Sequence, residues 1–253
     1  MSIATCAHLL LGAYEVSADF AELGVNYGSE SQDATTFGQN TRINKGGLKT
    51  ASFPGSGYLN LTSSGVEAVL FNTLGLDGTP ATVFVHGITV GSTVETGYAM
   101  PVLEPKLDLG ENIGVLLPFS MELVSAGNLV RAIPLANFLD TALSTGVTVG
   151  SAFNLGHAAT SEQLYAGWHV TALSTGLAAS ISAIVEAASS SGFGTASTRI
   201  SFSALTCKAG VWATPITPNA LSTDQPWYRT RITQSTGSST GAASNGLLWM
   251  AIQ

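Results

Sequence analysis

Histidine and cysteine are the side chains most able to bind a metal or act as nucleophiles, and neither type is clustered in this chain. The histidines stand at least 12 residues apart, at His8, His86, His157 and His169. Metal sites on helices pair histidines within one turn, so an isolated histidine on a strand favours a structural hydrogen bond. Cys6 and Cys207 are the only cysteines, and they are too far apart for a CxxC motif. We therefore expect two buried thiols and no metal site.

Other chemical motifs are also weak. No stretch has the G-x-x-x-x-G-K-[ST] pattern that cradles phosphates. Glu104, Asp108 and Glu111 could bind a cation together, but they lack the ligand order of an EF-hand, and we interpret them as a solvated acidic loop. We expect a protein that is not an enzyme and that has no cofactor.

Charge is sparse and uneven along the 253 residues. Only 10% of residues are charged, 45% are hydrophobic, and the net charge is −7. Residues 1–140 carry 13 acids and 5 bases, whereas residues 141–253 carry 3 acids and 4 bases. Such a balance argues against tight binding to nucleic acid, which needs clustered Lys and Arg. So few charges on a chain of this size also indicate that part of its surface is covered by copies of itself.

Hydrophobic patterning and the many Gly, Ser and Thr residues indicate a mainly β protein. Strands are expected within residues 8–32, 48–61, 81–90, 115–124, 165–170, 181–188, 199–203, 228–234 and 247–252. One helix is expected from Ser64 to Leu74, opened by a capping box of Ser64 and Glu67. We predict domains at 1–135 and 151–253, joined by a linker at 136–150, with an antiparallel jelly-roll-like sandwich as the second domain.

The stretch from Asp33 to Lys49, DATTFGQNTRINKGGLK, holds three of the nine basic residues. Its Gly and Asn residues suit turns, and it reads as a long loop that leads into a strand. One interpretation is an ordinary solvated connection. The other is a subunit contact, in which backbone groups pair with a neighbouring sheet edge and basic side chains meet acids on an adjacent subunit.

The order of strand pair, D-x-T-T-x-G loop with a following Arg and G-G-L-K, strand, short helix and paired strands resembles the tail tube proteins of long-tailed bacteriophages. The resemblance covers roughly residues 8 to 135. It implies an N-terminal tail-tube-like β-sandwich or barrel with one short helix. The residues assigned to the assembly contact are Asp33, Thr35, Thr36, Phe37, Gly38, Arg42, Lys45, Gly47, Leu48 and Lys49.

The resemblance also implies a function. It implies a virion protein that is made in the host bacterial cytoplasm and assembles with itself into stacked hexameric rings. These rings would form the tail tube through which the genome passes, with other tail proteins at the ends. DNA would transit without specific binding, because an acidic wall repels it.

A different class of function is a binding module, either a head-decorating or a carbohydrate-binding phage protein. The four tryptophans could form a sugar-stacking platform, although core packing explains them at least as well: Trp168, Trp212, Trp227 and Trp249. No lysine or arginine precedes Arg42, so the start of the chain lacks a basic signal region. No apolar run reaches membrane-spanning length, and we expect no membrane partner.

Overall fold

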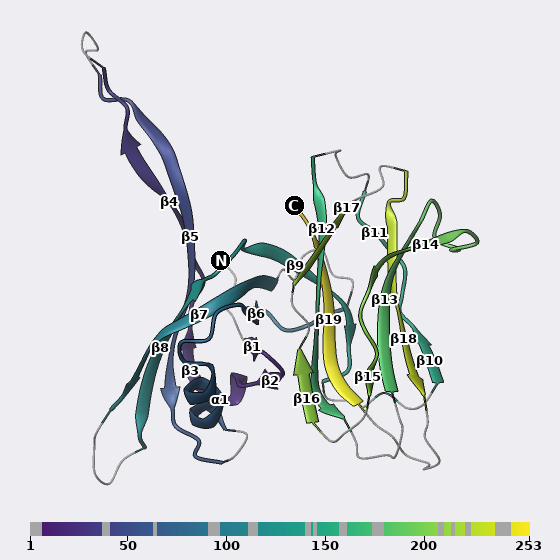
Figure 1. Cartoon of the computed structure of the whole chain (residues 1–253), viewed down its shortest axis with the longest axis horizontal. Coiled ribbons are helices and arrows are strands. Elements are labelled where there is room, and N and C mark those ends of the chain that lie inside the picture. The colour runs from purple at the N-terminus through teal and green to yellow at the C-terminus, as the bar shows by residue number, and fades with distance from the viewer. Residues whose placement is uncertain are drawn as a thin grey trace. The chain divides into compact units, whose positions relative to one another are not determined.

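The computed structural model describes residues 7–36, 41–62, 65–90, 97–110, 116–139, 143, 146–156, 161–173, 180–206, 210–213, 216–220, 224–235 and 244–253. Within these residues the chain is built from short and long β-strands (Figure 1). They also contain a single α-helix, α1 (Val66–Thr73), and one 3-10 helix, η1 (Ser17–Asp19). The mainly β prediction is confirmed.

The chain divides into two units that interleave in sequence. Unit 1 comprises Met1–Ala18, Thr79–Pro101 and Val130–Gln253, and unit 2 comprises Asp19–Gly78 and Val102–Leu129. The predicted domains at 1–135 and 151–253 are contiguous segments, and their limits remain a prediction about which parts fold on their own.

Unit 1 contains two antiparallel sheets. In the first, neighbouring strands follow the order β16, β12, β19, β9, β7, β6, β1, β2, and β17 also pairs with β12. In the second the order is β10, β18, β13, β14, with β11 and β15 paired to β18 and β13. The bounds are β1 His8–Leu11, β2 Tyr14–Glu15, β6 Thr79–Phe84, β7 Gly97–Leu109, β9 Val130–Asn137, β10 Gly146–Val149, β11 Phe153–Asn154, β12 Gln163–Leu173, β13 Ser180–Ala188, β14 Ala196–Ser201, β15 Leu205–Thr206, β16 Gly210–Ala213, β17 Thr217–Ala220, β18 Trp227–Ser235 and β19 Ser244–Ile252.

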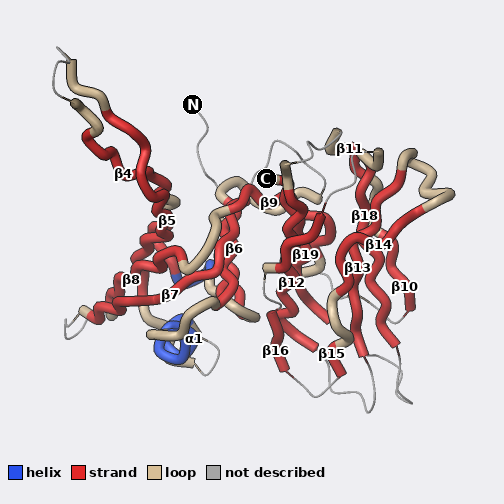
Figure 2. Tube along the Cα trace, turned by 45° about the horizontal axis from the view of Figure 1, so that its top comes forward, coloured by secondary structure: helices blue, strands red, loops and turns tan. Residues whose placement is uncertain are grey.

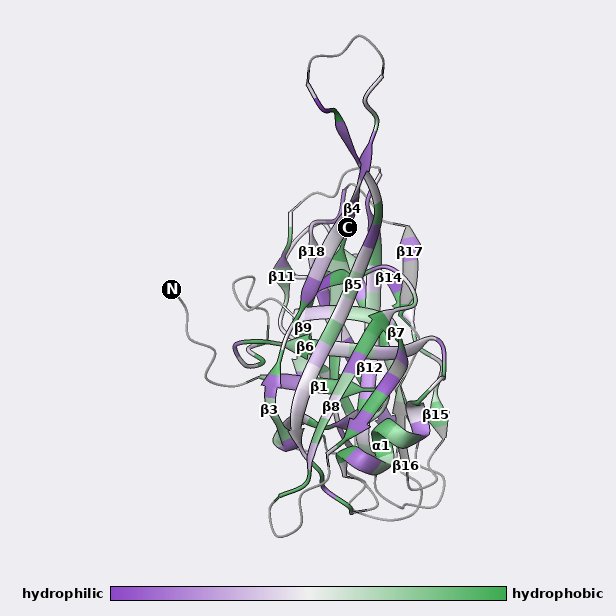
Figure 3. Cartoon of the chain, turned by 90° about the vertical axis from the view of Figure 1, so that its left-hand side faces the viewer, coloured by the Kyte–Doolittle hydropathy of each residue, from purple (hydrophilic) through white to green (hydrophobic). Residues whose placement is uncertain are grey.

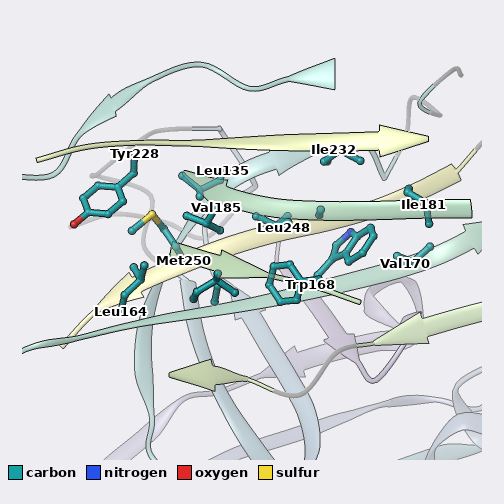
Figure 4. Close-up of a cluster of buried hydrophobic side chains, with 14 of the residues drawn as sticks. Leu135, Leu164, Trp168, Val170, Ile181, Val185, Tyr228, Ile232, Leu248 and Met250 are labelled. Carbon is teal, nitrogen blue, oxygen red and sulfur yellow. The ribbon is translucent and has the colours of Figure 1, made fainter. Parts of the chain in front are cut away.

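The two sheets of unit 1 face each other across an apolar core. β12 and β19 contribute Trp168, Leu248 and Met250 from one side, and β13 and β18 contribute residues such as Val185 and Ile232 from the other (Figure 4). Alternate residues of each strand point into this core, as the period of a β-strand requires. This arrangement confirms the predicted sandwich.

β19 is buried on both of its faces. Leu248 and Met250 belong to the core between the sheets, whereas Leu247, Trp249 and Ala251 belong to a second cluster with side chains from β1, β6, β7 and β9. A strand covered on both sides needs apolar residues at every position rather than at alternate ones. That requirement explains the uninterrupted run LLWMAI at this point of the sequence.

His169 links three segments of unit 1. Its Nδ1 lies 2.5 Å from the carbonyl oxygen of Gly12, and its Nε2 lies 2.9 Å from Oγ1 of Thr82. The Nε1–H of Trp249 also points at Nε2, at 3.5 Å. A neutral ring that donates from Nδ1 and accepts at Nε2 satisfies all three contacts. Burial lowers the pKa of His169 to about 4, although the bond to Gly12 opposes this. This histidine is the structural residue that the sequence predicts.

Acid should therefore weaken unit 1 through His169. Because the pKa falls from 6.5 to about 4 on folding, its stabilising effect is complete above pH 6.5 and is lost as the pH falls toward 4, by about 3 kcal/mol. All four tryptophans lie in unit 1, so their fluorescence during urea unfolding reports this unit. The wild type should lose more stability than His169→Gln between pH 7 and pH 4.5. Equal losses would contradict the prediction.

Unit 2 is a curved antiparallel sheet built around the long strand β5. Its strands are β3 (Phe20–Leu23), β4 (Asn26–Asp33), β5 (Asn44–Tyr58), β8 (Pro118–Ser125) and the Val102–Leu109 part of β7. β5 pairs with β3 and β4 along one edge and with β8 along the other, and β8 pairs with β7. One face of this sheet carries buried side chains, among them Phe53, Phe119, Met121 and Leu123.

Helix α1 is buried through Val66, Val69 and Leu70, and the predicted helix is confirmed. Its start is not the predicted capping box. Gly65 is the N-cap and provides no side-chain cap, while Ser64 lies outside the described residues. Instead, the backbone N–H of Val66 donates to Oδ2 of Asp19 at 3.2 Å. A carboxylate at this position also complements the positive end of the helix dipole.

Glu104 is buried beside the end of α1. Its Oε2 lies 2.8 Å from Oγ1 of Thr73, and the N–H of Gly75 donates to its backbone carbonyl. Its other carboxyl oxygen, Oε1, has no hydrogen-bond partner among the described residues. Burial raises the pKa of Glu104 to about 7, and the bond from Thr73 opposes the rise. The sequence-based interpretation of Glu104 and Asp108 as a loop is wrong, since both lie in β7; Glu111 lies outside the described residues.

Alkali should weaken unit 2 through Glu104. Because its pKa rises from 4.5 to about 7 on folding, its stabilising effect is complete below pH 4.5 and is lost as the pH rises through 7, by about 3 kcal/mol. Glu104→Gln keeps an acceptor for Thr73 and removes the charge. Hydrogen exchange of the β8 amides, corrected for intrinsic rates, should show the variant to be the more stable protein at pH 8 but not at pH 4. The same pH dependence in both proteins would rule out this role.

Candidate assembly site

The stretch from Asp33 to Lys49 is the end of a β-hairpin rather than a long loop. β4 and β5 remain paired up to Asp33 and Asn44, and the N–H of Ala34 donates to the carbonyl of Ile43 beyond them. Figure 2 shows this hairpin extending away from β7 and β8 of the same unit. The outer residues of β5, Asn44 to Lys49, lack the apolar alternation that marks a half-buried strand, which is why the pattern was misleading.

A hydrogen-bonded clamp fixes the described part of the hairpin tip. Oδ1 of Asp33 accepts from the backbone N–H of Thr35 at 2.9 Å and from its hydroxyl at 2.5 Å. Oδ2 accepts from Nε of Arg42 at 2.8 Å, and Oγ1 of Thr35 accepts from the N–H of Ile43. The bonds that Asp33 accepts lower the pKa of its carboxyl, and the bond from the Thr35 hydroxyl has the largest effect. The D-x-T motif and Arg42 therefore hold the two ends of the turn together.

Replacing Asp33 should loosen this turn without unfolding unit 2. Asp33→Ala removes the acceptor for Thr35 and Arg42, so the amides of Thr35 and Ile43 should exchange hydrogen faster while the β8 amides do not change. The clamp holds above the lowered pKa of Asp33, and the wild-type turn should loosen as acid protonates this carboxyl. Ser31→Ala, on the same strand, is the matched control. Unchanged exchange at Thr35 in Asp33→Ala would refute the clamp.

The predicted contact residues fall into three groups. Asp33, Thr35 and Arg42 form the clamp, and Thr36 follows it as an exposed residue. Phe37 and Gly38 lie outside the described residues. The remaining four lie in β5 and are Lys45, Gly47, Leu48 and Lys49.

A β-bulge shapes the outer part of the hairpin. Ser29 is opposite Lys49 and Ser31 is opposite Gly46, so Gly47 and Leu48 together face the single residue Glu30. Such a bulge increases the local twist and re-aims side chains. Leu48 is left 75% exposed, which is unusual for a large apolar side chain on a polar ribbon.

The hairpin offers an open strand edge and exposed apolar groups. Every residue of β4 is exposed, and among the described strands only β5 pairs with it. Figure 3 shows largely hydrophilic residues along the outer part of this hairpin. Tyr27, Ile43 and Leu48 are exposed exceptions. Arg42 already pairs with Asp33 in its own chain, whereas no ion pair holds Lys45 or Lys49 within the described part of the chain.

The sheet of unit 2 has a second exposed surface, which we call the polar face. It lies opposite the face that carries Phe119 and Met121, because residues alternate along β8. It includes three carboxylates and one lysine, namely Glu22, Asp108, Glu122 and Lys106, around an open concavity of about 510 Å³. Lys106 Nζ lies 2.5 Å from Oδ2 of Asp108. Cross-strand register places Glu22 beside Ser56, and Lys106 beside Glu122.

Two of the four tryptophans cannot form the sugar-stacking platform that the sequence offers. Trp168 and Trp249 are fully buried, so they cannot serve as a sugar-stacking platform, and core packing explains them. The pentapeptide GSSTG at 237–241 has the spacing of a serine nucleophile elbow. These five residues lie outside the described part of the chain.

Neither a metal-ion site nor a membrane-spanning helix is found within the described residues. They contain no group of three or more His, Cys, Asp or Glu side chains placed to hold a metal ion. Of the helices in the described ranges, none is long and apolar enough to cross a membrane.

Comparison with known proteins gives structural similarities at low sequence identity. No protein-family model matches the chain, and no curated protein matches it. A chain from the virion of a native gene transfer agent particle is 14% identical with a TM-score of 0.42, and the match covers 52% of this chain and 98% of that one. A chain from the tail of an empty gene transfer agent particle, refined with C6 symmetry, is 15% identical with a TM-score of 0.36, covering 45% and 81%. The SPP1 Dit protein, described as a paradigm of the hub adsorption apparatus in phages that infect Gram-positive bacteria, is 10% identical with a TM-score of 0.37, covering 98% and 100%.

Proposed function

We propose that this chain is a structural subunit of a phage-type virion tail, and that it associates with copies of itself through the β4–β5 hairpin. The observation that carries the proposal is a long, exposed hairpin with a clamped tip and an edge on β4 that no other described strand pairs with. The motif resemblance of residues 8 to 135 to tail tube proteins supports the same reading. It supplies the finer expectation of stacked hexameric rings that form a tube for the genome.

Physical chemistry explains why the hairpin needs a partner. A two-stranded ribbon is marginally stable alone in water, and an open edge presents unpaired N–H and C=O groups to any other strand. A neighbouring copy that pairs with β4 or covers Leu48 would satisfy these groups. Lys45 and Lys49 would then be available to meet carboxylates of that neighbour, and the clamp reduces the ordering cost of the contact.

The polar face provides the surface for a channel. Glu22, Asp108 and Glu122 outnumber Lys106 on this face, and duplex DNA carries one negative charge per about 1.7 Å of its axis. A channel lined in this way would repel the duplex and let it pass without specific binding. In this proposal Glu22, Asp108 and Glu122 line the channel, because they share one exposed face.

The decisive experiment removes the hairpin and leaves the sheet. Joining Gly28 to Thr50 through Asn-Gly deletes residues 29–49 at a position where the two strands are paired, and Asn-Gly closes a two-residue hairpin turn. The shortened protein should remain folded, since the deleted residues bury little. Electron micrographs should show rings or tubes with a central channel for the wild type and only single subunits for the shortened protein.

A matched control separates the hairpin from exposed apolar surface in general. Phe71 and Leu76 are exposed apolar residues of unit 2 outside the hairpin, and Phe71→Ser with Leu76→Ser should still assemble. Assembly by the hairpin-deleted protein would refute the proposed contact. A wild type that stays monomeric at high concentration would refute self-assembly itself, and a glycan-binding monomer would favour the binding-module alternative.

A further inference from the structure

The outer face of the second sheet of unit 1 carries a group of charges that the assembly function does not use. Core residues alternate along β13 and β18, and they include Val185 and Ile232. Glu186 of β13 and Arg229 and Arg231 of β18 therefore lie on the opposite face. Register places Glu186 directly across from Arg229, and Ile184 across from Arg231.

Both arginines hold the same carboxylate. Nε of Arg229 donates to Oε2 of Glu186 at 2.8 Å, and Nη2 of Arg231 donates to its Oε1. The Glu186 side chain is 3% exposed, whereas those of Arg229 and Arg231 are 22% and 41% exposed. Two positive charges thus meet one negative charge. No other acid shares this face of the described β10, β13, β14 and β18 strands, whose outward neighbours include Val147, Val149, Ser182, Ile184, Thr198, Ser201 and Thr233.

Donor groups remain after these bonds are made. A guanidinium carries five N–H donors in a fixed fork, and each arginine uses one of them on Glu186. Among the described residues, no other hydrogen bond is made by the guanidinium of Arg229 or Arg231. The remaining donors are on partly exposed groups, so they can reach a molecule in solvent.

An unusual backbone conformation places an aromatic ring against Arg229. Phe193 lies in the turn between β13 and β14, where its N–H donates to the carbonyl of Ser190. It has φ of +50° and is the only described non-glycine residue with positive φ. Its ring lies 4.2 Å from Cζ of Arg229. Strain of this kind persists where the surroundings determine it, and it often occurs at functional sites. Here the conformation of Phe193 places its ring against the guanidinium of Arg229, which also donates to Glu186.

We propose that Arg229 and Arg231 form a binding site for an oxyanion, a carboxylate or phosphate group presented to the outer face of β18. Glu186 and Phe193 are positioning residues, since they hold the two guanidinium groups in place. Paired guanidinium forks recognise the oxygens of such groups through charge-assisted hydrogen bonds. The apolar Val147 and Val149 of β10, both exposed beside β18, would contact the body of the molecule that carries the anion.

The test uses inorganic phosphate and acetate as probes of the full-length protein. The Nε–Hε NMR signals of Arg229 and Arg231 should shift and saturate as either anion replaces chloride at constant ionic strength, and Arg229 reports binding in variants that lack Arg231. The anion that saturates at lower concentration identifies the preferred chemistry. Arg231→Gln should weaken binding by about 10-fold or more, as loss of a charge-assisted bond predicts. Arg131→Gln, which removes an exposed arginine of β9 in the other sheet of unit 1, should bind as the wild type does.

A second variant guards against simple misfolding. Phe193→Gly suits the positive φ of its position, so it should stay folded, but it removes the ring that orients Arg229. Weaker binding by folded Phe193→Gly would support the positioning role. If neither anion shifts the Arg229 and Arg231 signals beyond the chloride control, or if Arg231→Gln binds as well as Arg131→Gln does, the proposed site is wrong.

Discussion

Glu186→Ala should destabilise unit 1 by about 2–3 kcal/mol, because two partly exposed guanidinium groups lose their charge-assisted hydrogen bonds to the shared carboxylate. Glu186 is buried, and its two oxygens accept from Arg229 and Arg231. Coulomb repulsion between the arginines adds to the loss. Urea unfolding followed by tryptophan fluorescence measures the effect. Thr233→Ala, an exposed change on the same face of β18, should alter stability by less than about 0.5 kcal/mol.

A triple variant distinguishes lost charge pairing from lost packing. Replacing a buried ion triad with apolar residues of similar size is often neutral, so Glu186→Leu with Arg229→Met and Arg231→Met should recover most of the stability. A loss below about 1 kcal/mol in Glu186→Ala would mean that solvent reaches the pair more readily than the buried carboxylate indicates.

Trp168→Ala should cost unit 1 about 3–5 kcal/mol, the usual range for removing a fully buried tryptophan. Trp168 has no exposed surface, and its ring lies 5.8 Å from that of Phe202 within the core between the sheets. Because that core closes from both sheets, its neighbours cannot easily fill the cavity.

Trp227 provides the matched control for Trp168. It is only partly buried and lies outside that core, so Trp227→Ala should cost less than half as much. The remaining tryptophans still report unfolding by fluorescence in either variant. Equal losses in the two variants would show that burial in the core is not what makes Trp168 important.

The strands of the sandwich could be predicted because their residues alternate or run continuously. β12, β13, β18 and β19 lie where the sequence places them, and Arg229 and Arg231 share a face as their spacing requires. The local pattern of apolar residues was enough to predict these strands, because one or both faces of each strand are buried. Helix α1 was predictable for the same reason.

Features that depend on distant pairing could not be predicted from local pattern. Asp19 caps a helix that begins 47 residues later in sequence, and His169 contacts a carbonyl 157 residues away. The outer part of β5, from Asn44 to Lys49, carries no apolar period, so this end of the hairpin looked like a loop. Glu186 and Phe193 become partners of the arginines only through the register of β13 with β18 and the turn that follows.

The interleaving of the two units has a consequence for the order of folding during synthesis. Every segment of unit 2 precedes residue 130, whereas the central strand of unit 1, β19, begins at Ser244. Unit 2 can therefore form its sheet while the ribosome is still producing the rest of the chain. β1, β6 and β9 must wait for β19 with apolar side chains uncovered, since Leu10, Phe84 and Val130 pack in its cluster. Slow, long-range strand pairing exposes a nascent chain to aggregation. The apolar side chains of β1, β6 and β9 are covered only when β19 packs against them.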